Sequence, residues 1–131
     1  MASITKAATA DVDMTMLLHA RQIPDLVAGE DIPVCSPVYI KASDGKVYRA
    51  NGTAATEPAT VHGFVARNVK TNQAITVFKS MRVLWAATGL TPGSKVFLGA
   101  SAGGLDTAAT TGGTAPIGHA INATDLYLGV A

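Results

Sequence analysis

Residues 38–50 read Val-Tyr-Ile-Lys-Ala-Ser-Asp-Gly-Lys-Val-Tyr-Arg-Ala, and this stretch decides the fold. Most residues in 38–41 and 46–49 are β-branched or aromatic, which favours extended backbone. Between them, residues 43–45 (Ser-Asp-Gly) are typical of a tight turn, because glycine adopts a positive φ without steric cost. The stretch therefore predicts an antiparallel hairpin.

The chain carries this pattern a second time, 58 residues later. Residues 96–108 read Val-Phe-Leu-Gly-Ala-Ser-Ala-Gly-Gly-Leu-Asp-Thr-Ala, so that Gly45 corresponds to Gly103. A strand expected after each hairpin extends the repeat, with Gly63 corresponding to Gly118 at an offset of 55. A glycine within a strand predicts a bulge or a close approach of two backbones.

Short apolar stretches separated by Gly, Pro and Asn turns recur along the chain, and no long segment has the 3.6-residue period of a helix. We therefore predict an all-β fold, an antiparallel β-sandwich or jelly-roll-like barrel in which the two hairpins are equivalent strand pairs. A length of 131 residues suits one domain. We place the β-sandwich at residues 23–131, after an extended N-terminal arm at residues 1–22.

The N-terminal arm contains several large apolar side chains but no glycine. Two interpretations remain open for it: a frayed terminus with a first edge strand, or an arm that lies on a neighbouring molecule. In the second case, its exposed apolar side chains form a protein interface. These candidate interface residues are Ile4, Val12, Met14, Met16, Leu17 and Leu18.

Trp85 is the sole tryptophan and lies in the apolar stretch 81–87. A tryptophan in such a strand belongs to the core more often than to the surface. The alternative is an interface anchor, a role that tryptophan often has in protein complexes. On this alternative, Trp85 joins the candidate interface residues.

Charged residues make up 15% of the chain and hydrophobic residues 48%, whereas the usual charged share is about 25%. So few charges protect a monomer poorly against association, which favours a surface covered by partners over an uncharged monomeric domain. The net charge is +1 and the basic residues are scattered. We therefore expect no nucleic-acid binding, which needs a basic stripe or stacking aromatic residues.

The sequence contains no pattern that predicts catalysis, a metal site or a cofactor. Cys35, the only cysteine, lies between two prolines without a cationic neighbour in sequence, and we expect it to be buried and unreactive. The three histidines are too far apart in sequence to predict a metal site; they are His19, His62 and His119. The Gly-Gly pairs at 103–104 and 112–113 lack the Lys-Ser/Thr of a phosphate-binding loop, and there is no G-x-S-x-G motif. We expect the protein not to be an enzyme.

No apolar run reaches the length of a membrane-spanning helix, and the N-terminal residues lack the apolar run of a signal peptide. We therefore expect that the protein is synthesised in a cytoplasm and does not contact a membrane.

Six stretches, in this order, resemble the small capsid cement (decoration) proteins of tailed bacteriophages. They are Ala28–Glu30, Pro37–Ile40, Asp44–Ala50, His62–Ala66, Gly89–Thr107 and Pro116–Asp125. The similarity covers about residues 26–130 and leaves residues 1–22 unmatched. Its most specific part runs from Gly-Leu-Thr-Pro-Gly at 89–93 to Ala-Gly-Gly-Leu-Asp-Thr at 102–107.

The resemblance implies a β-rich structural protein on the outer surface of an icosahedral head, assembled in the bacterial host cytoplasm. Such proteins bridge neighbouring major capsid subunits and stabilise the shell against internal DNA pressure. Members act as dimers or trimers; we favour a dimer, with a trimer as the alternative. The resemblance implies no catalytic residue. The competing hypothesis is another β-rich virion module, such as a tail domain or a glycan-binding head fibre.

Overall fold

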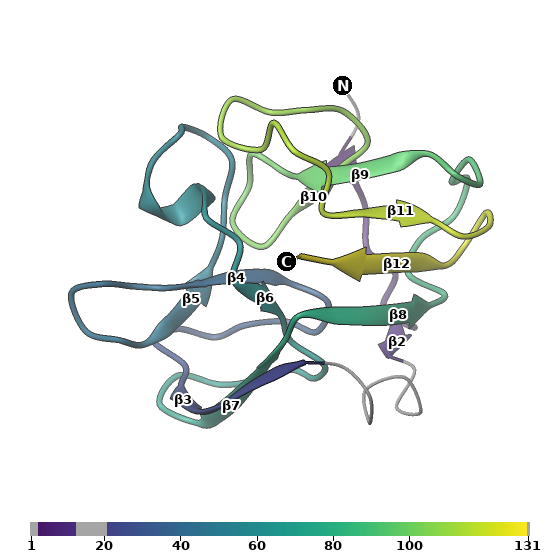
Figure 1. Ribbon diagram of the computed structural model, residues 1–131. Coiled ribbons are helices and arrows are strands. Elements are labelled where there is room, and N and C mark those ends of the chain that lie inside the picture. The colour runs from purple at the N-terminus through teal and green to yellow at the C-terminus, as the bar shows by residue number, and fades with distance from the viewer. Residues whose placement is uncertain (1–2, 13–20, 131) are drawn as a thin grey trace.

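The computed structural model describes residues 3–12 and 21–130, which form short strands and one turn of 3-10 helix (Figure 1). The predicted all-β class is therefore confirmed. In chain order the elements are β1 (Ser3–Ile4), β2 (Asp11–Val12), β3 (Gln22–Val27), β4 (Pro37–Ile40), β5 (Val47–Arg49), η1 (Glu57–Ala59), β6 (Gly63–Phe64), β7 (Ala74–Phe78), β8 (Ser80–Leu84), β9 (Lys95–Leu98), β10 (Leu105–Asp106), β11 (Gly118–Ala120) and β12 (Leu126–Gly129).

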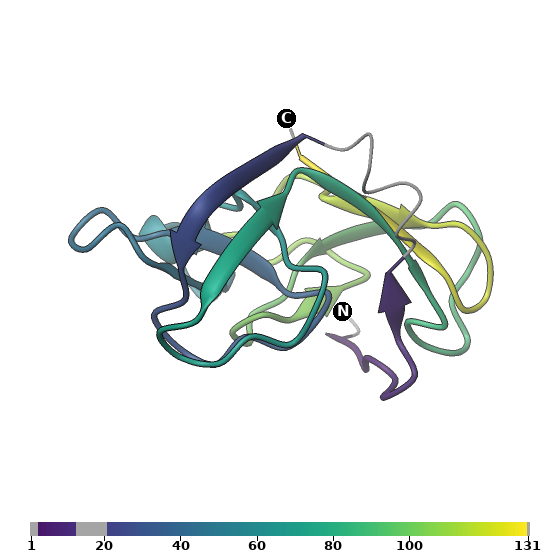
Figure 2. The same cartoon turned by 90° about the horizontal axis from the view of Figure 1, so that it is seen from below.

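The strands form two antiparallel sheets, as predicted for a β-sandwich. The five-stranded sheet has the order β3-β7-β6-β4-β5, and the seven-stranded sheet has the order β1-β10-β9-β11-β12-β8-β2. Figure 2 shows β3 and β7 of the first sheet on one side of the molecule and the C-terminal strands of the second on the other. Within the described residues, no helix is long and apolar enough to cross a membrane.

The two sheets contain the same five-stranded unit twice. Starting from β5, the first sheet runs β5-β4-β6-β7-β3, and starting from β10, the second runs β10-β9-β11-β12-β8. Each unit consists of five consecutive strands of the chain, so residues 22–78 and 80–129 are two halves of one duplicated fold. The internal repeat predicted from the hairpins is confirmed and includes two more strands in each half.

The two hairpins have the same register. Tyr39 lies opposite Tyr48 in β4 and β5, and Phe97 lies opposite Asp106 in β9 and β10, each residue shifted by 58 positions. The hairpin turns are equivalent as well, because Gly45 has a φ of 71° and Gly103 a φ of 69°. Both glycines adopt the left-handed conformation that side chains disfavour.

The glycines that begin β6 and β11 also share one structural role. Gly63 lies opposite Val38, and Gly118 lies opposite Val96. A Cβ atom on Gly63 would overlap the side chain of Val77, and one on Gly118 would overlap the carbonyl oxygen of Tyr127. The close approach predicted for these two positions is therefore confirmed.

The described parts of the N-terminal arm form both edges of the seven-stranded sheet. β1 pairs with β10 at one edge and β2 pairs with β8 at the other. Residues 5–10 alone connect β1 with β2, a span of at most about 25 Å, whereas the outer strands of a flat seven-stranded sheet lie about 29 Å apart. The sheet therefore curls into a half-barrel, and its two edges are joined by one short segment.

Ile4 and Val12 are buried in the chain's own core, with exposed fractions of 9% and 3%. Their neighbours Ser3 and Asp11 take the outer face, since alternate residues of a strand point to opposite sides. The expectation that Ile4 and Val12 are exposed is therefore wrong, and the edge-strand interpretation of these two segments is confirmed.

The apolar side chains form two clusters, on the two faces of the five-stranded sheet. Tyr39 and Phe64 belong to the larger cluster, which includes the buried residues of the seven-stranded sheet. Val38 and Val47 belong to the smaller one. Each such side chain contributes about 1.5–3 kcal/mol on full burial, so the first half is stabilised from both of its faces.

Candidate functional site

The structure describes three of the predicted interface residues, Ile4, Val12 and Trp85. Ile4 and Val12 lie in the core. Met14, Met16, Leu17 and Leu18 fall outside the described residues. Trp85 is the exception, because 56% of its surface is exposed. The interpretation of Trp85 as a core residue is therefore wrong, and the exposure that an interface anchor requires is present.

Trp85 follows the last residue of β8 and has a φ of 51°, in the left-handed region. The indole borders a shallow hollow formed by small side chains from three parts of the chain. These are Ala7, Thr9, Ala87, Thr88 and Thr124. None of them is ionisable, so a partner covering this surface would desolvate little charge.

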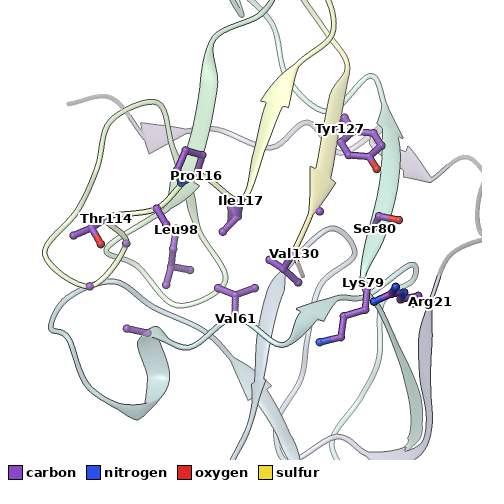
Figure 3. A pocket seen from close by; sticks show the side chains of 15 residues that line it. Arg21, Val61, Lys79, Ser80, Leu98, Thr114, Pro116, Ile117, Tyr127 and Val130 are labelled. Carbon is purple, nitrogen blue, oxygen red and sulfur yellow. The ribbon is translucent and has the colours of Figure 1, made fainter.

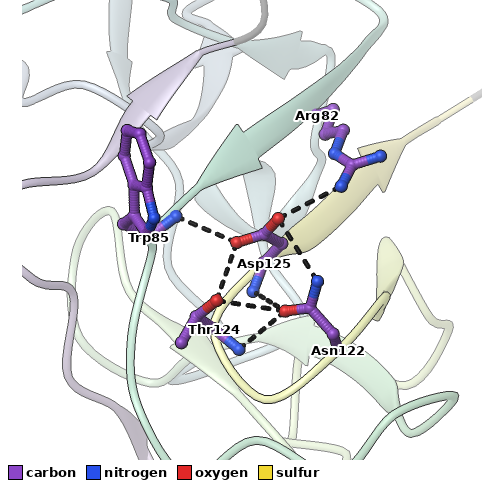
Figure 4. Close-up of polar contacts among 5 residues, drawn as sticks. All are labelled: Arg82, Trp85, Asn122, Thr124 and Asp125. Carbon is purple, nitrogen blue, oxygen red and sulfur yellow. Dashed lines mark hydrogen bonds and ion pairs between the residues drawn. The ribbon is translucent and has the colours of Figure 1, made fainter.

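The backbone of Trp85 is held by Asp125, whose side chain is 9% exposed (Figure 4). The Trp85 N–H donates to Asp125 Oδ1 at 3.1 Å, and the Thr124 hydroxyl donates to the same oxygen at 2.9 Å. Arg82 Nη2 donates to Asp125 Oδ2 at 3.1 Å. A carboxylate with several donors fixes the backbone that presents the indole.

These contacts also change the acidity of Asp125. Burial opposes ionisation of the carboxyl, but the hydrogen bonds from the Trp85 N–H, Thr124, Arg82 and Asn122 outweigh it and lower the pKa below its ordinary value. The carboxylate is therefore ionised at neutral pH. The hydrogen bonds to Asp125 hold the backbone beside Trp85, while the Nε of Arg82 is buried without a hydrogen-bond partner among the described residues.

A second feature is an open groove of about 720 Å³ where the two halves meet (Figure 3). The first half contributes Val61, and the second contributes Leu98 and Ile117. Lys79, between the two halves, and Val130, directly after β12, complete this part of the lining. Arg21 and Lys79 are its only charged lining residues within the described ranges. Sequence patterns did not indicate this groove, since its two cations lie 58 positions apart and meet only through the pairing of β3 with β7.

Cys35 is fully buried, as expected. Burial raises the pKa of its thiol to about 11, which keeps the sulfur protonated and unreactive near neutral pH. Across the described residues, no three His, Cys, Asp or Glu side chains are grouped so as to hold a metal ion.

Lys6 connects the N-terminal segment with both halves. Its Nζ donates to the carbonyl oxygen of Gly103 at 2.7 Å and lies 3.4 Å from both Cys35 O and Ser36 Oγ. Burial, partly offset by Cys35, lowers the pKa of this amine. The contacts explain its position as a bridge between the halves, and no motif in the sequence indicated them.

Comparison with known proteins finds no family model that matches this chain and no similar curated protein. The class of the protein is therefore defined by its structure, a duplicated antiparallel β-sandwich.

Proposed function

We propose that this chain is a structural virion protein that binds the outer surface of a tailed-phage capsid. In this role it bridges neighbouring major capsid subunits and stabilises the head against internal DNA pressure. The sequence resemblance to capsid cement proteins supports the proposal, and the observation that carries it is the exposed indole of Trp85. The proposal requires neither catalysis nor a cofactor, and it places the protein on the virion after assembly in the host cytoplasm.

Trp85 has the properties of an interface anchor. A large aromatic side chain supplies much contact area with few rotatable bonds, and tryptophan is enriched among the residues that dominate binding energy. The hollow beside it contains only Ala and Thr side chains. A partner side chain can enter that hollow while the indole packs on the partner's surface.

Many copies of one modest interface suffice to hold a capsid lattice. Once one contact of a bridging molecule has formed, its second contact is effectively intramolecular. We propose a dimer as the bridging unit, with a trimer as the alternative. Sedimentation equilibrium of the purified protein measures this state directly.

The test uses purified heads that lack the protein and measures how much added protein sediments with them. Trp85→Gly is expected to lower the occupancy at subsaturating concentration by about tenfold or more, as loss of a central tryptophan anchor does. Val27→Ala is the matched control, because Val27 is also a large exposed apolar residue, at 39%. Equal occupancy for Trp85→Gly and the unchanged protein would contradict the assigned role of Trp85.

Deleting the N-terminal arm is a poorer test. Residues 3–12 supply both edge strands of the seven-stranded sheet. Their removal would therefore open the half-barrel and, at the same time, remove any contact that the arm makes with a neighbour.

The exposed indole also supports the alternative of a tail or head-fibre module that binds a glycan, since aromatic faces pack on sugar rings. Copy number distinguishes the two functions. A cement protein is present in hundreds of copies per virion, whereas tail and fibre parts are present in far fewer. Binding of Trp85-containing protein to a glycan array, together with a low copy number, would favour the fibre module.

A further inference from the structure

The groove between the two halves has an apolar floor and a cationic end. Buried or half-buried side chains of Val61, Leu98, Ile117 and Val130 form the floor. In Figure 3, Arg21 and Lys79 lie together at one end of the groove, and Thr114 and Pro116 lie at the other. Binding sites for ligands commonly combine such an apolar surface with a few polar groups at fixed positions.

The two cations are held close together by the backbone. The Lys79 N–H donates to the Arg21 carbonyl oxygen at 2.9 Å, and the Val130 N–H donates to the Lys79 carbonyl oxygen at 2.9 Å. Within the described residues, neither Arg21 nor Lys79 forms an ion pair. Two positive charges therefore face the groove beside apolar side chains.

None of the described residues that line the groove is acidic. Glu57, two residues before Ala59 of the groove wall, does not line the groove, and its carboxylate accepts a hydrogen bond from the Ala42 N–H at 2.9 Å. Burial and then the charge of Lys79 lower the pKa of the neighbouring His62, and the charge of Glu57 partly offsets them.

We propose that this groove binds an extended segment of a partner protein in which a carboxylate side chain is flanked by small apolar side chains. The carboxylate pairs with Lys79 and Arg21, and the apolar side chains pack on the floor. Charge-assisted hydrogen bonds of this kind are about twice as strong as neutral ones. The inference deepens the proposed function, since it gives the chemistry of a second contact between this protein and its partner.

The position of the groove adds a consequence for the bound state. Its walls come from both halves of the duplicated fold, and Lys79 is the residue that connects β7 with β8. A segment bound there contacts both halves at once, so occupancy stabilises their relative placement.

The experiment is a titration of the full-length ¹⁵N-labelled protein with two short peptides, followed by NMR. One peptide is acetyl-Ala-Val-Asp-Val-Ala-amide, and the other has Asn in place of Asp. The aspartate peptide is expected to shift the amide signals of Gly113, Ile117 and Val130 and to bind at least about fivefold more tightly than the asparagine peptide. Raising the salt from about 50 to about 500 mM is expected to reduce this difference.

Variants locate the interaction. Lys79→Gln is expected to weaken binding of the aspartate peptide about fivefold and to leave the asparagine peptide almost unaffected. Lys95→Gln is the control, because it removes the same charge from an exposed lysine of β9 outside the groove. Equal affinity of the two peptides, shifts confined to another surface, or no shifts up to about 10 mM peptide would each overturn the proposal.

The outcomes separate this inference from the proposed function. If heads bind the protein through Trp85 while the peptides do not bind, the groove inference alone is wrong. If the aspartate peptide binds as described and heads do not take up the protein, the groove inference stands and the capsid role is wrong. A dimer that dissociates when Lys79 is replaced would show that a second copy occupies the groove and would overturn the assignment to a different protein.

Discussion

Asp25 and Trp85 occupy the same position in the two halves of the chain, and both have left-handed backbone, with φ values of 64° and 51°. Asp25 interrupts the pairing of β3 with β7, between Ile23 and Leu26. Trp85 follows β8 at the same point, where Val83 lies opposite Leu126 in β12. The left-handed backbone of Trp85 is therefore a feature that both halves of the duplicated fold share. What distinguishes Trp85 from Asp25 is the indole side chain.

This equivalence predicts an unusual order of stability at position 85. Trp85→Gly is expected to be more stable than Trp85→Ala by about 1 kcal/mol, because glycine alone adopts a left-handed φ without steric cost. Urea unfolding of both variants measures the difference. Leu84 is the control, since it precedes the left-handed residue; there the alanine variant is expected to be the more stable of the two.

The two strand glycines are expected to be intolerant of any side chain. Gly118→Ala and Gly63→Ala should each lower the free energy of unfolding by about 2 kcal/mol or more, because the new methyl group overlaps atoms of the adjacent strand. Gly45→Ala is the comparison, since a Cβ there meets no atom within 4 Å. Its expected loss is about 1–2 kcal/mol, from the positive φ alone. Similar losses at all three positions would contradict the close packing.

The buried thiol of Cys35 predicts a loss of stability at alkaline pH. Its pKa is raised from 9.0 to about 11 in the folded protein. The stabilisation from the protonated thiol is complete below pH 9 and is lost as the pH rises toward 11, because the unfolded chain releases the proton first. We expect the stability advantage over Cys35→Ala to fall by about 2 kcal/mol between pH 8 and pH 11. A constant difference, measured by urea unfolding, would contradict this assignment.

Asp125 predicts a loss of stability at acidic pH. Its pKa is lowered in the folded state, so its contribution is present above the unfolded value of about 3.8 and disappears as the pH falls through the folded value. Asp125→Asn should cost about 1–2 kcal/mol at pH 7, because Arg82 and the Trp85 N–H lose a charged acceptor. The difference between the variant and the unchanged protein should shrink toward pH 2 in urea unfolding. A difference independent of pH would assign the stabilisation to shape rather than charge.

The duplicated core of the fold was predictable because its signals are local. Gly45 and Gly103 mark turns of one type at an offset of 58, and Gly63 and Gly118 mark one close contact at an offset of 55, so nearly the same shift aligns both pairs. These positions require glycine for steric reasons, which makes the pattern visible in the sequence.

The edges and surfaces were not predictable because they depend on pairing between distant segments. β1 and β2 contain two residues each, too few to show an alternating pattern, and their partners lie far along the chain. Trp85 is exposed where the chain leaves β8 with a left-handed backbone, and the apolar residues around it in sequence do not indicate this turn. The groove needs Arg21 and Lys79 side by side, just outside the paired strands β3 and β7, and only the sheet order establishes that pairing.

The arm that joins the two edges of the half-barrel also sets the order in which the protein is able to fold. Ser3 pairs with Asp106, so this contact must wait until more than a hundred further residues have left the ribosome. The first half, residues 22–78, contains its own five-stranded sheet and its own apolar cluster, and it is complete before that. Pairs so distant in sequence form slowly, and Ser3 and Ile4, synthesised before both halves, are therefore among the last residues to find their partners.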